Sequence, residues 1–205
     1  MRFDRALARQ FARPSGLIGR LLIGPWLDRI SAPMSRLARE MLAPKPGERL
    51  LDVGFGGGGL IAALHRAGAV PIGVDVSETM VARGRRRFPG IELHCAPAHN
   101  LPLADSSVAK AVSLNSLYFW VDPAAGFAEL ARVIVPGGRL VIGFEPPQEL
   151  RKWPGHRHGF RLFEVQEVTK LMSEAGFGSI EEKWGCGRKP DLFCCLSGAR
   201  IGANR

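Results

Sequence analysis

The sequence predicts an α/β protein with a Rossmann-like, seven-stranded, mostly parallel sheet whose last strand is antiparallel, with helices on both faces and a helical N-terminal extension. From residue 49 onward, short apolar runs alternate with amphipathic segments, which is typical of a parallel sheet covered by helices. The last two apolar runs are joined by a short, glycine-containing connection, which favours an antiparallel pair. The 205 residues suffice for one domain with a full core.

Each strand is expected where a short apolar run is bounded by turn residues. The expected strands are residues 50–53, 70–75, 91–95, 108–114, 139–144, 178–183 and 191–196. The expected helices are residues 60–66, 77–87, 124–133 and 165–175, the last of them ended by Gly176. Pro136-Gly137-Gly138 is expected to break the chain before the fifth strand.

Residues 1–48 are predicted to form a helical extension, and residues 49–205 the main domain. Pro14, Pro25 and Pro33 divide the extension into about three short helices. Basic residues gather here, in a chain whose formal net charge is +9. The extension is interpreted as a lid over a ligand site, or as a basic amphipathic surface that makes peripheral contact with anionic lipid. A lipid-like substrate would make both interpretations compatible.

Two observations favour a cytoplasmic protein. No apolar run approaches the roughly 20 residues that span a bilayer, and the Arg-rich start lacks the apolar stretch of a signal peptide. The four cysteines form no Cys-x-x-Cys pair, so inert thiols are expected rather than a metal site.

The strongest motif is the run LLDVGFGGGGL at residues 50–60, a strand that leads through a glycine-rich turn into a helix. Glycines allow close approach of the backbone to a ligand, and the helix start offers free N–H groups. The glycine spacing also fits nicotinamide dinucleotide sites. Asp52 distinguishes a dinucleotide site from a site for S-adenosylmethionine (SAM). A carboxylate at this position repels the pyrophosphate of a dinucleotide but favours an ammonium such as that of SAM. Here the sequence resembles the class I SAM-dependent methyltransferases, whose first motif is an acidic residue, any residue, then alternating glycines.

Asp75 ends the second expected strand. A carboxylate at this position can accept hydrogen bonds from both ribose hydroxyls of a nucleoside. Enzymes that use NAD share this feature, so Asp75 indicates nucleoside binding without identifying the cofactor.

Three later segments, residues 98–103, 112–118 and 131–140, extend the resemblance to the subgroup that includes ubiquinone and menaquinone methyltransferases. The resemblance implies that SAM contacts Asp52, Gly54, Phe55, Gly56, Gly58, Asp75, Val76, Ala98, His99 and Asn115. Pro97 replaces an acidic residue that meets adenine in many relatives. The residues after the fourth strand, 115–118, lack the Asn/Asp-Pro-Pro-aromatic signature of amino methylation, so methylation of DNA bases is discounted.

Two residues are candidates for catalysis. His158 lies in the loop after the fifth strand, where a ligand-facing histidine can remove a proton near neutral pH; a solvated loop is the alternative. Tyr118 follows the fourth strand and can wall an acceptor pocket, or pack within its loop. The basic cluster of residues 83–87 is interpreted as a solvated helix face, and nucleic acid is not expected as a partner.

The resemblance therefore implies transfer of a methyl group from SAM to a small, apolar or lipid-like acceptor by in-line displacement, with no metal. Two alternatives stay open at this point. A nicotinamide-dependent oxidoreductase usually carries Tyr-x-x-x-Lys, but the only tyrosine, Tyr118, is followed four residues later by Asp122. A non-catalytic, SAM-binding or membrane-associated protein would keep the pocket without turnover.

Overall fold

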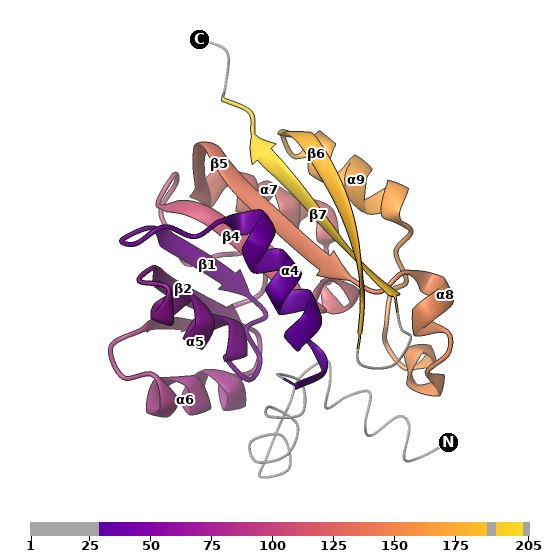
Figure 1. Ribbon diagram of the computed structural model, residues 1–205, viewed down its shortest axis with the longest axis horizontal. Coiled ribbons are helices and arrows are strands. Elements are labelled where there is room, and N and C mark those ends of the chain that lie inside the picture. The colour runs from indigo at the N-terminus through magenta and orange to yellow at the C-terminus, as the bar shows by residue number, and fades with distance from the viewer. Residues whose placement is uncertain (1–28, 188–191, 203–205) are drawn as a thin grey trace.

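The computed structural model describes residues 29–187 and 192–202, which form one seven-stranded sheet in the order β3-β2-β1-β4-β5-β7-β6 (Figure 1). The strands are β1 Arg49–Val53, β2 Val70–Asp75, β3 Glu92–Cys95, β4 Val108–Leu114, β5 Ile134–Phe144, β6 Phe177–Cys186 and β7 Leu192–Arg200. Strands β1 to β5 pair in parallel, and β7 runs antiparallel to both β5 and β6. The predicted fold class is confirmed.

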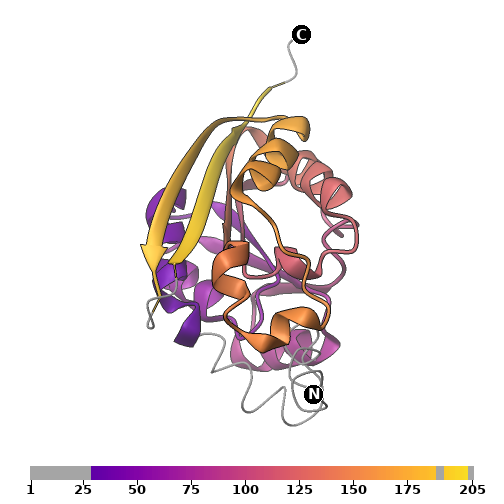
Figure 2. The same cartoon turned by 90° about the vertical axis from the view of Figure 1, so that its right-hand side faces the viewer.

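Helices cover both faces of the sheet (Figures 1 and 2). One face carries α4 Ala32–Leu42, α5 Gly59–Arg66 and α6 Glu78–Arg87; the other carries α7 Pro123–Val133 and α9 Val165–Glu174. Short helices follow β4 and β5: η2 Leu117–Phe119, α8 Pro147–Leu150 and η3 Pro154–Arg157. Buried apolar side chains fill both layers, so each face of the sheet has its own core.

Local hydrogen bonds place the helix starts. The Ser77 side chain accepts a hydrogen bond from the N–H of Met80 at the start of α6, and Asp122 accepts one from the N–H of Ala125 in α7. Such caps satisfy N–H groups that have no partner inside the helix. Both caps follow directly on loops at the carboxyl ends of strands, so they also fix where those loops end.

The expected break at residues 136–138 is wrong as a boundary of β5. The strand begins at Ile134 and contains these residues as a bulge, since Val108 pairs with Ile134 but Lys110 pairs with Arg139. A side chain at Gly138 would place its Cβ atom 2.4 Å from the carbonyl oxygen of Ala109. The glycine therefore permits a close approach of two backbones while the strand continues.

Helix α4 is the described part of the predicted N-terminal extension. Pro33 lies in its first turn, where a proline is tolerated, and does not interrupt it. Met34, Ala38 and Leu42 bury this helix against the sheet. The predicted helices around Pro14 and Pro25 lie outside the described residues, so the lid and the lipid contact stay predictions. Within the described residues, no helix is both long and apolar enough to cross a membrane.

Candidate active site

A cavity of about 1030 Å³ opens where β1, β2 and β4 end. Ligands bind at this edge in open α/β sheets. Nearly all the residues predicted to contact the cofactor line this cavity: Asp52, Gly54, Phe55, Gly56, Asp75, Val76, Ala98, His99 and Asn115. Gly58 is the exception. The structure thus brings together residues that lie more than 60 positions apart in the sequence.

The glycine-rich loop adopts a backbone conformation that residues other than glycine disfavour. Gly54 and Gly56 adopt φ values of 78° and 51°. The N–H of Gly54 donates to the carbonyl of Val74 at 2.7 Å, which ties the loop to β2. A Cβ atom on Gly54 would lie 2.4 Å from the Cβ atom of Ser116, so the loop also lies tightly against the end of β4.

Gly58 has a packing role rather than a place on the cavity wall. It caps α5 with a φ of 82°, and a Cβ atom there would lie 2.5 Å from the ring of Phe88. Phe88 directly follows α6, so its ring packs the end of this helix against the glycine-rich loop.

The arginines of α6 hold the same loop from behind. Arg87 and Arg83 donate hydrogen bonds to the carbonyl oxygen of Gly57 at 2.6 and 3.4 Å. Arg85 donates to the carbonyl of Leu93 at 3.1 Å. The predicted solvated face is confirmed for Arg85, Arg86 and Arg87, which are exposed, while Arg83 is half-buried; three of the four arginines also bond the backbone.

Asp75 is buried at the end of β2, and both of its carboxylate oxygens are oriented by backbone donors. Oδ2 accepts from the N–H of Gly56 at 2.9 Å, and Oδ1 accepts from the N–H of Ser77 at 2.8 Å. Burial raises the pKa of Asp75, and the two N–H donors partly oppose that shift. Since an ionised carboxylate offers about four acceptor positions, two remain for a ligand in the cavity.

The third wall comes from the segment after β3. Pro97, Ala98 and His99 line the cavity together with Val76, whose side chain is 40% exposed. Arg132 holds the continuation of this segment by donating to the carbonyls of Leu101 and Leu103 at 3.0 and 2.7 Å. Glu129 accepts from Arg132 and from the N–H of Leu101, and these bonds lower the pKa of Glu129. The two sequence segments 98–103 and 131–140 are thus physically connected.

A chain of hydrogen bonds crosses the ends of β4 and β5. Asn115, with a φ of 54°, donates to the hydroxyl of Ser31 at 3.2 Å. The Tyr118 hydroxyl donates to Oδ1 of Asn115 at 3.2 Å and accepts from the N–H of Glu145 at 2.5 Å. Burial, and then the charge of Glu145, raise the pKa of Tyr118 well above its ordinary value. Tyr118 therefore keeps its proton near neutral pH and donates it in the hydrogen bond to Asn115, and its catalytic role stays a prediction.

Three half-buried aromatic residues, Phe119, Trp153 and Phe160, form what we name the aromatic wall of the cavity. The ring centroids of Phe119 and Phe160 are 4.5 Å apart, and those of Trp153 and Phe160 are 5.2 Å apart. Sequence reasoning missed Trp153 and Phe160. The only available signal was their place in the loop after β5.

His158 is not among the described residues that line the cavity. The turn η3 and Gly159, with a φ of 94°, redirect the chain so that Trp153 and Phe160, on either side, reach the wall. This arrangement gives no support to His158 as a base, and its catalytic role stays a prediction.

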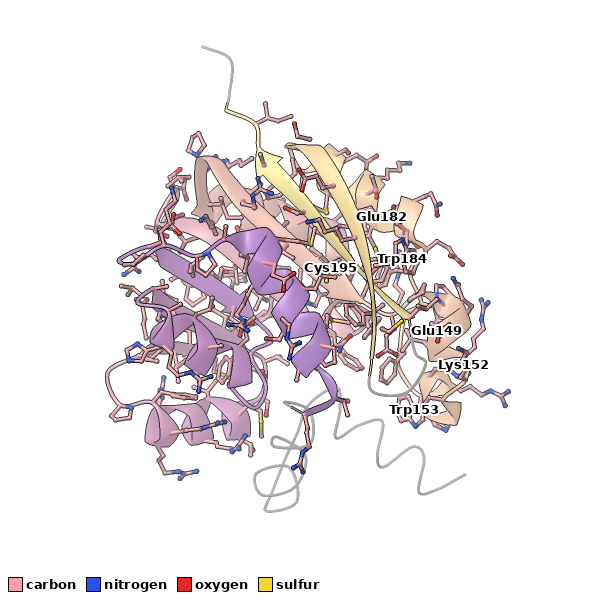
Figure 3. The ribbon with its side chains drawn as sticks, viewed as in Figure 1. Glu149, Lys152, Trp153, Glu182, Trp184 and Cys195 are labelled. Atoms are coloured by element: carbon pink, nitrogen blue, oxygen red, sulfur yellow. The ribbon has the colours of Figure 1, made fainter. Side chains whose placement is uncertain are left out.

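An ion pair also lines the cavity on this side, at α8 and the turn after it (Figure 3). Lys152 contacts the buried carboxylate of Glu149 at 2.5 Å, while the Lys152 side chain is 56% exposed. Neither residue was singled out from the sequence, because an i,i+3 charge pair on a short helix has no distinctive pattern.

Comparisons with known proteins agree with this geometry. Residues 51–142 match the family model described as a methyltransferase domain. A demethylmenaquinone methyltransferase of Corynebacterium kroppenstedtii is 39% identical over 107 residues, which are 52% of this chain and 46% of the relative. The O-methyltransferase cnsE of Penicillium expansum is 33% identical over an alignment of 198 positions, gaps included, and the match covers 80% of this chain and 67% of the relative. The chain spans about half the length of the demethylmenaquinone methyltransferase.

Among solved structures, a chain from the complex of the Haloferax volcanii Trm112 methyltransferase activator with a methyltransferase superposes with a TM-score of 0.80. The two chains are 18% identical, and the match covers 97% of this chain and 98% of the other. At this identity, the match shows the shared fold. Together with the sequence relatives and the glycine-rich loop, it shows that the chain belongs to the class I SAM-dependent methyltransferases.

Proposed function

We propose that this protein transfers the methyl group of SAM to a small, apolar acceptor that carries an aromatic ring. One observation carries the proposal: the glycine-rich loop with Asp75 and the aromatic wall line the same cavity. Its volume of about 1030 Å³ lies at the upper end of ligand pockets, which span roughly 300 to 1,000 Å³. A cavity of this size suits a cofactor together with a second small molecule.

The residues present fit the cofactor. Asp75 keeps two acceptor positions, which match the two hydroxyls of a ribose. Asp52 is buried at the end of β1 and suits the ammonium of the methionine part. Val76, Ala98 and His99 line the cavity and offer mostly apolar contacts for adenine. When bound, SAM supplies an electrophilic methyl group on a sulfonium sulfur.

The protein's own contribution is alignment and exclusion of water. Asn115 is held at both ends of its amide, by Tyr118 and by Ser31, so it presents one fixed orientation to the cavity. The aromatic wall lines the same cavity as Asn115 and reduces the polar surface that would hold water there. Fixed alignment of two reactants is worth up to about 7 to 11 kcal/mol of a reaction barrier. An in-line displacement then needs no covalent nucleophile from the chain.

The acceptor class rests on the aromatic wall and on the relatives. Aromatic side chains favour flat aromatic ligands by stacked and edge-to-face contacts. The relative from Corynebacterium kroppenstedtii is named for demethylmenaquinone, a ring of this kind with an apolar tail. Among aromatic rings, a reduced, electron-rich one is a far better nucleophile toward an electrophilic methyl group than an oxidised quinone, so the acceptor in this proposal is a reduced quinone or a phenol.

The cofactor is tested by titrating the purified chain with SAM, S-adenosylhomocysteine and NADH in a calorimeter. We expect micromolar binding of the first two and none of NADH. Binding of NADH alone would favour the oxidoreductase instead.

The acceptor is tested with SAM labelled on its methyl group and three acceptors: a short-chain demethylmenaquinone reduced with dithionite, a simple phenol, and an aliphatic amine of similar size. We expect label in the first or the second product. Label only in the amine would contradict the acceptor class. Tight SAM binding without transfer to any acceptor of a wider panel would favour a non-catalytic binding protein.

A further inference from the structure

We infer that Glu149 is a catalytic residue whose carboxylate accepts the hydroxyl proton of the acceptor, and that Lys152 positions this carboxylate. The inference rests on the proposed function, since it requires a phenol-like acceptor in the cavity. Both residues line the cavity together with Trp153 of the aromatic wall (Figure 3). They lie beyond residue 142, where the match to the family model ends.

The backbone after α8 places Glu149 beside the aromatic wall. The N–H of Lys152 donates to the carbonyl of Glu149 at 3.1 Å, and the N–H of Trp153 donates to the carbonyl of Leu150 at 3.0 Å. These bonds continue the turn of α8, and side chains three and four residues apart in a helical turn are neighbours. The Glu149 carboxylate therefore lies on the same face of the turn as the Trp153 ring.

One oxygen of the Glu149 carboxylate is held, and the other is open. Oε2 accepts a hydrogen bond from Nζ of Lys152 at 2.5 Å. Oε1 accepts no hydrogen bond from the described residues, and it is not among their fully buried polar atoms that lack a partner. Oε1 is therefore accessible to a molecule in the cavity, although the side chain as a whole is only 7% exposed.

A purely structural role does not account for this burial. Removing a carboxylate from water costs free energy that one ion pair offsets only in part. The Lys152 side chain is 56% exposed, so water weakens its attraction to Glu149. An ion pair that only stabilised this turn would serve as well at the surface, as the pair Lys170–Glu174 does. A buried carboxylate with an open oxygen instead suits a pocket in which a few polar groups orient the ligand.

The polar side chains at the ends of β4 and β5 are less suited to accept a proton. Tyr118 keeps its own proton and donates it to Asn115. The amide of Asn115 carries no basic group. Glu145 also lines the cavity, but its backbone N–H donates to the Tyr118 hydroxyl, which places it beside that residue. Glu145 is therefore the rival carboxylate that the experiment must separate from Glu149.

The proposed step balances in atoms and charge. The O–H bond of the acceptor breaks, its proton passes to Oε1 of Glu149, and an electron pair of the oxygen forms the bond to the methyl carbon. The bond from that carbon to sulfur breaks, and its electron pair stays on sulfur as a neutral thioether. Glu149 then releases the proton to water. The relative from Penicillium expansum is named for methyl transfer to oxygen.

The test uses the full chain, SAM labelled on its methyl group, and two phenols at one pH. At that pH 4-nitrophenol is largely ionised, whereas 1-naphthol keeps its proton. The variants are Glu149→Gln and Glu145→Gln, together with Lys152→Met and Lys152→Arg. Glu174→Gln, which removes an exposed carboxylate paired with Lys170 on α9, is the matched control.

We expect Glu149→Gln to lower kcat for 1-naphthol by at least about 100-fold, because a positioned base contributes about 100- to 10,000-fold. The same variant should methylate 4-nitrophenol at least as fast as the wild type does, since that proton is already gone and a repelling charge is removed. Calorimetry should show unchanged affinity for S-adenosylhomocysteine, which also reports that the variant is folded. The Glu174→Gln control should match the wild type throughout.

The role of Lys152 has its own readout. Lys152→Met should lower kcat for 1-naphthol by about tenfold, with little change for 4-nitrophenol, and Lys152→Arg should restore most of the loss. In the Glu149→Gln background, Lys152→Met should cause no further loss, because it acts through that carboxylate. Independent losses in the double variant would contradict the positioning role.

Equal losses for both phenols in Glu149→Gln would overturn the inference, because they would indicate disturbed binding and not a missing base. A loss in Glu145→Gln with none in Glu149→Gln would assign the proton to the rival carboxylate. Failure of the wild type and of Glu149→Gln alike to methylate 4-nitrophenol would overturn the inference as well, as would a wild type that binds SAM but labels no phenol. A wild type that does not bind SAM fails the proposed function first.

Discussion

The two halves of the cavity are built in different ways. The half that we propose for the cofactor is formed by β1, the glycine-rich loop, the end of β2 and the segment after β3. Most of its specific features are backbone features: positive φ values at Gly54 and Gly56, and N–H groups that orient Asp75. The half that we propose for the acceptor consists of side chains, Phe119, Trp153 and Phe160 with the pair Glu149–Lys152, on three short helices and the loops between them.

This difference predicts how each half responds to substitution. A backbone site depends on a few positions that tolerate one residue type, so a single added methyl group can disturb it. A wall of packed aromatic rings shares its contacts, so one truncation weakens it without removing it.

The largest effect is expected for Gly54→Ala. The new Cβ atom would lie 2.4 Å from that of Ser116 on a backbone with a φ of 78°. We expect a loss of about 2 to 4 kcal/mol in the free energy of unfolding, from strain and overlap, measured by urea denaturation. SAM affinity should fall by at least about a hundredfold. To relieve the overlap, the loop must shift further than its hydrogen bonds to the ligand can tolerate.

Gly90→Ala is the matched control for Gly54→Ala. Gly90 has a φ of 90°, but no atom lies within 4 Å of a Cβ atom placed there. This variant isolates the cost of the backbone conformation, which is about 1 kcal/mol. Similar losses in the two variants would show that contact with Ser116 is unimportant.

Asp75→Ala should weaken SAM by about tenfold to a hundredfold, because one or two charged hydrogen bonds to the ribose are lost. The measurement is calorimetric titration, with Glu174→Ala, a 61% exposed carboxylate on α9, as control. The N–H groups of Gly56 and Ser77 also lose their acceptor, so urea denaturation should accompany the titration. Unchanged SAM affinity would contradict the ribose assignment.

Phe160→Ala tests the acceptor half. Phe160 contacts the rings of Tyr118, Phe119 and Trp153, with the nearest centroid at 4.5 Å. We expect the KM for an aromatic acceptor to rise about tenfold, while SAM affinity changes less than about twofold. A large loss of SAM affinity would mean that the two halves are not independent.

The same contrast explains what the sequence could predict. The glycine-rich loop and Asp75 were predictable because adjacent residues fix their backbone geometry, and the parallel sheet followed from alternating apolar runs. Trp153 and Phe160 were not, because a short 3₁₀ turn and the positive φ of Gly159 decide which of the loop residues face the cavity. His158 had the right chemistry, yet this turn leaves it off the cavity wall.

The smallest effect is expected for Tyr118→Phe, at the boundary between the halves. Removing the hydroxyl removes the acceptor to which the part-buried N–H of Glu145 donates, at a cost of about 1 kcal/mol in the free energy of unfolding. Burial, with the charge of Glu145 as a smaller cause, raises the pKa of Tyr118 in the folded protein above that of the unfolded chain. The stability contributed by its proton is therefore complete below about pH 10 and declines above it. Urea denaturation of both proteins from pH 6 to 10.5 should give a constant difference up to about pH 9.5 that then shrinks. A difference that changes near neutral pH would instead indicate that Tyr118 titrates there, which would contradict the raised pKa.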